Sequence, residues 1–171
     1  SDFCRLTEGG RSLMSSVEVL DLSAACTVDV GCVSFRGHDG RRSSSHFLNV
    51  ASAGINGLID RYANDSSKRL GGMLTFMLAT AKALRDYEPA VVKLYLDDRE
   101  LGPIDVNTIA VCNGQYAGGG MHLAPDARLD DGLFDVLVIE QGPLTRAVPV
   151  GVKLYRGTHT SESRINLYRA R

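Results

Sequence analysis

The residues with the clearest chemical potential lie between Asn113 and Glu140, where acidic residues and glycines gather in two short segments. Asp130-Asp131-Gly132 places two carboxylates on a tight corner. Carboxylates and turn carbonyl oxygens together make an oxygen-rich pocket for a hard cation such as Mg²⁺ or Ca²⁺. Gly118-Gly119-Gly120 lets several backbone N–H groups converge on an anion, or lets backbone approach another group closely. The alternative is that both segments are hairpin turns without a ligand.

Other common site motifs are missing from the sequence. There is no G-x-x-x-x-G-K-[ST] phosphate loop, and no G-x-G-x-x-G joins an expected strand to an expected helix. The four cysteines form no C-x-x-C pair, and the four histidines show no H-E-x-x-H spacing. A zinc site is therefore not expected, and the cysteines are expected to be free thiols in a reducing cytoplasm.

Charge and composition restrict the class of protein further. The 171 residues include 19 Lys+Arg and 20 Asp+Glu, and this formal net charge of -1 argues against a nucleic-acid binder that works through bulk positive charge. No apolar run reaches the about 18 residues of a transmembrane helix, so membrane contact is expected to be peripheral at most. No signal peptide is visible, and both ends look like those of a fragment. We expect a cytoplasmic protein whose full-length form could associate with membranes.

Periodicity predicts the elements that must hold the two turns. Apolar residues recur at helical spacing over Lys68–Tyr87, which predicts one long helix with its Leu70–Leu84 stripe packed in the core. A shorter helix is expected over Pro143–Tyr155, kinked or broken at Pro149. Residues 1–24 have a broken helical pattern, and residues 37–45 are typical of a polar loop or hairpin turn. Strands are predicted at Cys26–Phe35, His46–Ala53, Val91–Leu96, Asn107–Cys112, Phe134–Ile139 and Arg164–Arg171.

Several of these segments together resemble a known family. Asn113–Val136 reads N-G-x-Y-x-G-G-G-M-x-x-A-P-D-A-x-x-D-D-G-x-x-D-V. This run resembles the second domain of the diacylglycerol kinase catalytic family, most closely the bacterial soluble lipid kinases related to sphingosine and ceramide kinases. Ser1–Arg5 resembles the family's G-T-x-N-D-F-A-R segment without its first residues. Val28–Val33 resembles I-D-L-G-x-V, Phe47–Gly54 resembles F-x-N-V-A-G-x-G, and Arg69–Gly71 resembles the opening of the family's long helix.

The resemblance implies a two-domain enzyme that uses ATP and Mg²⁺ to phosphorylate a lipid hydroxyl such as that of diacylglycerol. Residues 1–171 would form its second domain, an α+β, mostly β fold. This is an antiparallel β-sandwich of the diacylglycerol kinase/NAD kinase-like type, with one long and one or two shorter helices. The family's G-G-D-G-T nucleotide motif and its D-G-E segment do not occur in this sequence. The general base is therefore expected beyond Arg171, and the chain alone is expected to be inactive.

The resemblance also assigns site residues. Asp131 matches a ligand of a structural Mg²⁺, whose other protein ligands fall on the main-chain oxygens of Arg128 and Leu133. Asp29 matches a carboxylate that joins this metal through water, although it could equally be an exposed strand residue. Asp2 would lie near the ATP phosphates, and it could also cap a helix.

Neighbouring residues are expected to be structural. Asp130 and Asp135 are expected at the surface, and His122 is expected to face solvent or a polar neighbour. The three glycines would shape the wall of a cleft or form a bulge with close strand packing. The expected partners are a lipid alcohol and a possible second copy of the chain, and no nucleic acid. The rival interpretation is a non-catalytic lipid-sensing or regulatory module with the same fold.

Overall fold

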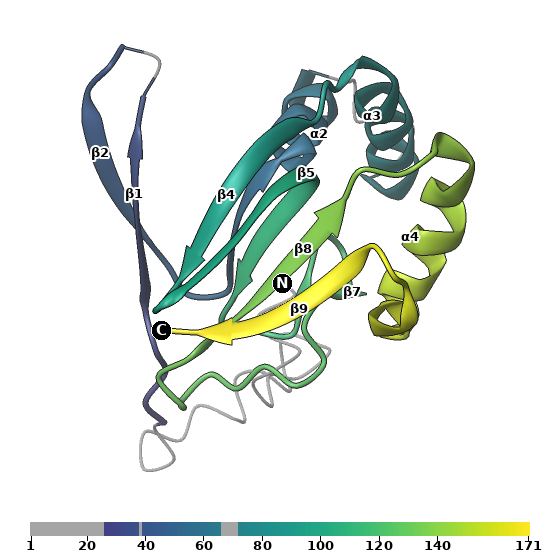
Figure 1. Cartoon of the computed structure of the whole chain (residues 1–171). Coiled ribbons are helices and arrows are strands. Elements are labelled where there is room, and N and C mark those ends of the chain that lie inside the picture. The colour runs from purple at the N-terminus through teal and green to yellow at the C-terminus, as the bar shows by residue number, and fades with distance from the viewer. Residues whose placement is uncertain (1–25, 38, 66–71) are drawn as a thin grey trace, which may run out of the picture.

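The computed structural model describes residues 26–37, 39–65 and 72–171. An antiparallel sheet forms the body, helices α2 and α3 lie at one end of it, α4 lies beside it, and a two-stranded hairpin projects from it (Figure 1). The predicted helical segment 1–24, which includes Asp2, lies outside the described residues. The prediction of a mostly β, antiparallel α+β fold is confirmed.

The main sheet is organised around β5 (Arg99–Cys112), a strand of 14 residues. Its first half pairs with β4 (Ala90–Leu96) and its second half with β3 (Val50–Gly54), so these two strands share one edge of β5. β8 (Phe134–Glu140) pairs along the other edge, and β9 (Ile165–Ala170) pairs with β8. Every pairing is antiparallel. Because β5 and β8 have strand partners on both edges, they form the centre of the sheet.

The strand β5 is longer than the sequence pattern predicts. The prediction began it at Asn107, whereas it begins at Arg99. Gly102 and Pro103 interrupt the apolar alternation in the added part. They lie at an irregularity in the β4–β5 pairing. A β-bulge accommodates glycine and proline, which a regular ladder disfavours.

The hairpin consists of β1 (Gly31–Arg36) and β2 (Arg42–Phe47). Its register runs from Gly31 opposite Phe47 to Arg36 opposite Arg42. Of the two alternatives predicted for 37–45, a polar loop or a hairpin turn, the hairpin turn is confirmed, but its predicted end is wrong because the exposed Arg-Ser-Ser-Ser sequence from residue 42 onward is strand. The predicted strand 46–53 is divided, because β2 ends at Phe47 and β3 begins in the main sheet.

Helices α2 (Ile55–Asp65) and α3 (Gly72–Asp86) pack against each other at one end of the sheet (Figure 1). The predicted helix 68–87 is confirmed over residues 72–86, and its first residues lie outside the described part of the chain. The prediction did not include α2. The buried residues of this pair are Ile55, Ile59, Ala79 and Ala83.

The packed face of α3 differs from the predicted one. Ala79 and Ala83 are 3% and 0% exposed, whereas Leu78 is 54% exposed and Ala81 is also exposed. Small alanine side chains let a neighbouring helix approach closely, so α3 turns its alanine face toward the cluster it shares with α2. The prediction that the Leu70–Leu84 stripe packs in the core is therefore wrong at Leu78 and Ala81.

Helix α4 (Ala147–Arg156) follows a 3₁₀ turn at Leu144–Arg146. The predicted break falls before Pro149 rather than at it. Pro149 lies in the first turn of α4, where a missing N–H removes no helical hydrogen bond. Gly157 ends the helix with a φ of 67°, a left-handed conformation that glycine adopts at no steric cost.

Candidate functional site

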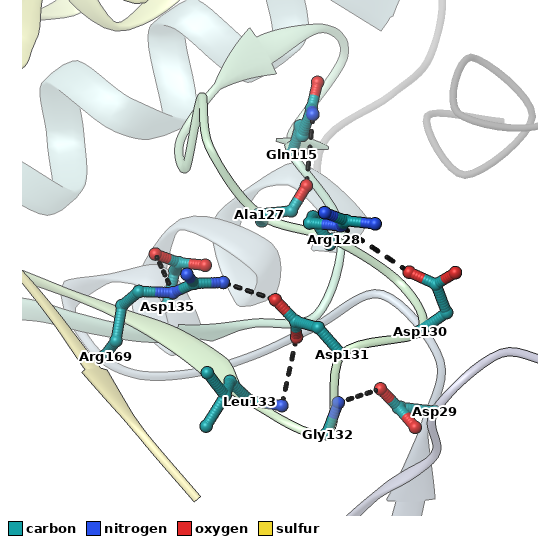
Figure 2. A network of polar contacts seen from close by, with 10 residues as sticks. All are labelled: Asp29, Gln115, Ala127, Arg128, Asp130, Asp131, Gly132, Leu133, Asp135 and Arg169. Atoms are coloured by element: carbon teal, nitrogen blue, oxygen red, sulfur yellow. Dashed lines mark hydrogen bonds and ion pairs between the residues drawn. The ribbon is translucent and has the colours of Figure 1, made fainter.

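The turn that precedes β8 gathers the acidic residues predicted to act together (Figure 2). Asp131 Oδ1 accepts a hydrogen bond of 3.1 Å from the Leu133 N–H. Asp29 Oδ2 accepts one of 2.7 Å from the Gly132 N–H, and the Asp29 N–H donates to the Leu129 carbonyl at 2.6 Å. Asp29 is thus tied to the turn by both its backbone and its side chain. The carboxylate of Asp29 is therefore held against the turn that carries Asp131, although the two residues are far apart in sequence.

A guanidinium from β9 completes this cluster. Arg169 Nη2 lies 2.5 Å from Asp131 Oδ2, and its Nε lies 3.6 Å from Asp135 Oδ1 (Figure 2). Asp135 is 2% exposed. Burial raises the pKa of Asp135, and the positive charge of Arg169 opposes that rise. The prediction of a surface position for Asp135 is therefore wrong, because the β8–β9 register sets it opposite Arg169.

The donor types of this turn fit a hard cation. In residues 26–37, 39–65 and 72–171, no group of three or more His, Cys, Asp or Glu side chains is placed to hold a metal ion. A cation at Asp131 would therefore depend on main-chain oxygens, as does the predicted set with Arg128, Leu133 and a water on Asp29. The Arg128 side chain is directed instead to exposed Asp130, at 3.8 Å (Figure 2). The metal roles of these four residues stay predictions.

Two asparagines anchor the chain behind the acidic turn. Asn113 is fully buried, and its Nδ2 donates to the carbonyls of Asp29 and Leu48 at 2.8 and 2.9 Å. Asn49 Nδ2 donates to the Tyr116 carbonyl at 2.8 Å. These bonds fix the segments before β1, between β2 and β3, and after β5 relative to one another. The sequence indicated only a turn at Asn113. The carbonyls that accept hydrogen bonds from its side-chain amide belong to residues far away in the sequence, so no local pattern reveals them.

The triple glycine forms a turn between two very short strands, β6 (Tyr116–Ala117) and β7 (Met121–His122). Gly118, Gly119 and Gly120 have φ values of 61°, 81° and 104°. Residues with side chains rarely adopt these φ values, so the backbone conformation of the turn is by itself a sufficient reason for the three glycines, and no bound ligand is needed to account for them. The ring of His122 stacks on that of Tyr116, with centroids 4.4 Å apart. His122 thus packs on an aromatic neighbour rather than simply facing solvent.

A cavity of about 600 Å³ lies between the helices and the sheet. Ile55 and Ile59 of the α2–α3 cluster line one side. Ala110, Leu137 and Leu154 line the other side and belong to a second apolar cluster, formed by the sheet and α4. This volume lies within the roughly 300–1,000 Å³ of small-molecule sites. Residues from both helices of the α2–α3 pair, from β5, β7, β8 and β9 of the sheets, and from α4 with the turn before it make its walls, so no sequence pattern predicted it.

Polar residues line part of the same cavity. Arg146, Glu162 and Arg164 are among them, and both arginines are exposed to solvent, so the cavity reaches the surface there. Glu162 accepts a hydrogen bond from Lys153 and lies 3.7 Å from Arg146. The hydrogen bond from Lys153 lowers the pKa of Glu162. The cavity therefore combines apolar walls with a charged rim, the arrangement that suits an amphiphile.

The cavity and the acidic turn lie along the same strand. The turn ends at Leu133, and Leu137 and Ile139 of β8 line the cavity. Leu137 follows Leu133 by four residue steps of extended chain, which corresponds to roughly 13 Å. None of the described helices is long and apolar enough to span a membrane.

Comparison with known proteins shows that the chain is similar to proteins named lipid kinases. Residues 49–171 match the family described as the YegS C-terminal NAD kinase beta sandwich-like domain. A "Probable lipid kinase YegS-like" of Chromohalobacter salexigens is 33% identical over 100 residues, which cover 58% of this chain and 32% of that protein. A "Diacylglycerol kinase" of Bacillus subtilis is 26% identical over 127 residues, which cover 74% of this chain and 41% of that protein.

Solved structures give the same relation at the level of the fold. A diacylglycerol kinase from Bacillus anthracis superposes with a TM-score of 0.59 at 18% identity, over 99% of this chain and 50% of that chain. The chain thus spans half the length of that structure, and less than half the length of the two curated relatives it matches above.

Proposed function

Because the chain belongs to the family of YegS C-terminal NAD kinase beta sandwich-like domains, we propose that it forms part of a kinase that transfers phosphate from ATP to a lipid hydroxyl such as that of diacylglycerol. Relatives named lipid kinase and diacylglycerol kinase support this proposal. In it, this chain supplies the lipid-binding wall of a cytoplasmic enzyme. Sequence on either side supplies the nucleotide cradle and the general base.

The observation that carries the proposal is the cavity between the two apolar clusters. Each methylene buried in such a space contributes about 0.8 kcal/mol, so an acyl segment of about ten methylenes gains about 8 kcal/mol before the cost of ordering the chain. The charged rim around Glu162 and Arg164 would keep the polar end of the lipid in contact with water. The lipid hydroxyl would then remain accessible to a phosphoryl donor.

Phosphoryl transfer depends mainly on positioning and on neutralisation of charge. In this proposal the chain contributes positioning, since the lipid's tail is held by the sheet and helices. Asp131, with the main-chain oxygens of Arg128 and Leu133 and a water on Asp29, would hold a Mg²⁺. That ion would brace the turn that leads into β8.

Filling the cavity tests the lipid assignment. Gly151 of α4 lines the cavity, and a Cβ added there meets no atom within 4 Å. Gly151→Phe should therefore fold normally while occupying the space, and it should weaken binding of a fluorescent short-chain diacylglycerol at least tenfold. Gly57→Phe is the matched control, because Gly57 of α2 is equally open but is not part of the cavity wall. Equal affinities in the two variants would show that the lipid binds elsewhere.

Transfer of label separates a kinase from a lipid-sensing module. With radiolabelled ATP and mixed lipids, the chain alone should yield no phospholipid above background, whereas the polypeptide extended on both sides should yield phosphorylated lipid. Robust turnover by the chain alone would contradict the placement of the general base. Lipid binding without transfer by the extended polypeptide would favour the sensing module.

The metal proposal has a separate test. A ligand that binds only the folded state stabilises it by about 2.7 kcal/mol at a hundredfold excess over its Kd. Mg²⁺ should therefore raise the melting temperature of the parent chain, and Asp131→Asn should abolish most of that rise. Asp29→Asn should reduce the rise less, and Asp130→Asn should leave it unchanged. If Mg²⁺ raised the melting temperature of Asp131→Asn as much as that of the parent, the metal role would be refuted and the segment would be a turn without a bound ion.

A further inference from the structure

Arg164 is a positioned cation at the mouth of the cavity. Its Nη1 donates a hydrogen bond of 2.6 Å to the Gln141 carbonyl. The same nitrogen lies 3.4 Å from the place that a Cβ would take at Gly142. Gln141, Gly142 and Arg164 all line the cavity. The guanidinium is therefore held across the rim, although the residue is exposed to solvent.

The other arginine of the rim already has a carboxylate partner. Arg146 lies 3.7 Å from Glu162, and Lys153 donates a hydrogen bond to the same carboxylate. Within the part of the chain that the structure describes, no carboxylate pairs with Arg164. Of these two arginines, Arg164 is thus the one whose charge is left for a ligand.

The free edge of the Arg164 guanidinium has the geometry of a carboxylate receptor. The hydrogen bond from Nη1 to Gln141 leaves Nε and Nη2 without a partner among the described residues. These two nitrogens present parallel N–H groups, which match the two oxygens of a carboxylate. A ligand whose carboxylate meets this edge would extend its other end toward the apolar walls, where Leu137 and Leu154 lie.

The charges around the mouth favour a ligand with one negative charge. Three positive and two negative groups lie on the rim or bond to it, which leaves a formal charge of +1; they are Arg146, Lys153, Arg164, Glu140 and Glu162. The carboxylate of Glu140 accepts a hydrogen bond of 2.9 Å from Asn166. One carboxylate from a ligand brings the sum to zero, whereas a phosphate monoester carries about -1.5 to -2 at pH 7 and would exceed it.

We propose that the cavity binds a free fatty acid, with its acyl chain between the two apolar clusters and its carboxylate on the Nε–Nη2 edge of Arg164. In the kinase, such a ligand takes the place of the lipid alcohol and inhibits transfer by competition. This inference rests on the proposed function, because both assign an acyl chain to the same cavity.

The expected effect follows from the exposure of the arginine. An ion pair in contact with solvent strengthens binding by up to about fivefold. Loss of the Arg164 charge should therefore weaken binding of a fatty acid by about that factor. It should leave a neutral ligand with the same chain unaffected. The effect should shrink as added salt screens the charges.

Displacement of Nile red, a neutral fluorescent probe, measures decanoate and decanol on the same protein. Arg164→Gln should weaken decanoate about fivefold and leave decanol unchanged, because glutamine retains an N–H donor for the Gln141 carbonyl. Arg99→Gln is the control, since Arg99 is exposed and is not part of the cavity wall, and it should change neither ligand. An equal loss of both ligands in Arg164→Gln, or an unchanged affinity for decanoate, would overturn the assignment.

The two ligands separate this inference from the proposed function. Gly151→Phe, which fills the cavity, should weaken decanoate and decanol alike. If it did so while Arg164→Gln left decanoate unchanged, the cavity would stand as a lipid site and the carboxylate assignment would fail. If Gly151→Phe left both ligands unchanged, neither would bind in the cavity, and both proposals would fail.

The carboxyl group of the ligand gives a readout that packing alone would not move. NMR titration of decanoate with an isotope-labelled carboxyl carbon measures the pKa of the bound ligand. A guanidinium in contact favours the ionised form, so this pKa should be lower in the parent than in Arg164→Gln. Equal pKa values in the two proteins would contradict the contact with Arg164.

Discussion

The stability of this domain should fall as the pH is lowered, because of His159. The side chain of His159 is fully buried, and its Nε2 lies 2.9 Å from the carbonyl oxygen of Leu123. A neutral ring with its proton on Nε2 donates that hydrogen bond. Burial lowers the pKa of His159 and nearby His122 lowers it further, whereas the carbonyls of Leu123 and Lys153 oppose the change.

The sign and size of the effect follow from linkage. An unfolded histidine takes up a proton below about pH 6.5, whereas the buried ring resists protonation. The unfolded state therefore binds more protons, and the free energy of unfolding falls as the pH drops through that range. A folded ring that binds no proton at all sets the upper limit of the effect, which is about 1.9 kcal/mol between pH 7 and pH 5. For a chain of this size, that limit corresponds to about 4–8 °C in melting temperature, and the measured fall should not exceed it.

The assay compares the parent with His159→Gln between pH 8 and pH 5 at constant ionic strength. Glutamine retains an N–H donor for the Leu123 carbonyl but does not titrate. The variant should be less stable at pH 8 because of imperfect packing, and the gap should close as the pH falls. The raised pKa of Asp135 acts in the opposite direction in both proteins, so it cancels in the difference. A gap that stays constant with pH would refute the assignment of the effect to His159.

Three further predictions concern the core and the polar cluster. Arg169→Gln leaves the buried carboxylate of Asp135 without its cation and should lower the free energy of unfolding in urea by about 1–3 kcal/mol. This loss is smaller than for a fully buried ion pair, because Arg169 is 46% exposed. Adding Asp135→Asn should recover part of the loss, and no recovery would count against the pairing. Leu137→Ala, at a side chain with 0% exposure, should cost about 2–5 kcal/mol in the same assay. Burial raises the pKa of Cys112 to about 12, so a thiol reagent at pH 8 should label exposed Cys32 rapidly and Cys112 only on unfolding.

Local pattern was sufficient for the elements with unbroken periodicity. The strand predicted over Phe134–Ile139 is confirmed with one added residue, and α3 is confirmed where it is described. The sequence pattern did not predict the first half of β5, because Gly102 and Pro103 interrupt the alternation there. Pairing with β4 keeps this segment in the sheet, and a bulge accommodates the two residues. The pattern also failed for the packed face of α3, since a helix with apolar residues around much of its surface does not reveal which side meets its neighbour.

The candidate site could be predicted only in part, for a similar reason. The resemblance indicated that Asp29 and Asp131 act together. The structure holds the carboxylate of Asp29 against the turn that carries Asp131, and their metal role stays a prediction. Nothing in the sequence pointed to Arg169, because its contacts depend on a register between strands separated by about 30 residues. The cavity was equally hidden, because its walls come from α2, the sheet and α4 together.

The charge of the acidic turn bears on how a cation could bind there. Asp29, Asp131 and Asp135 contribute three negative charges when all are ionised, and Arg169 contributes one positive charge, which leaves a formal charge of -2. Arg169 contacts Asp131 and Asp135, whereas the carboxylate of Asp29 is held by a backbone N–H alone in this network. A divalent cation on this turn would bring the sum to zero. Arg169 contacts Asp131, which is the residue proposed to bind the Mg²⁺, so the guanidinium and the ion would share that carboxylate. The charge of -2 that remains beside Arg169 is what would still attract a cation to this turn.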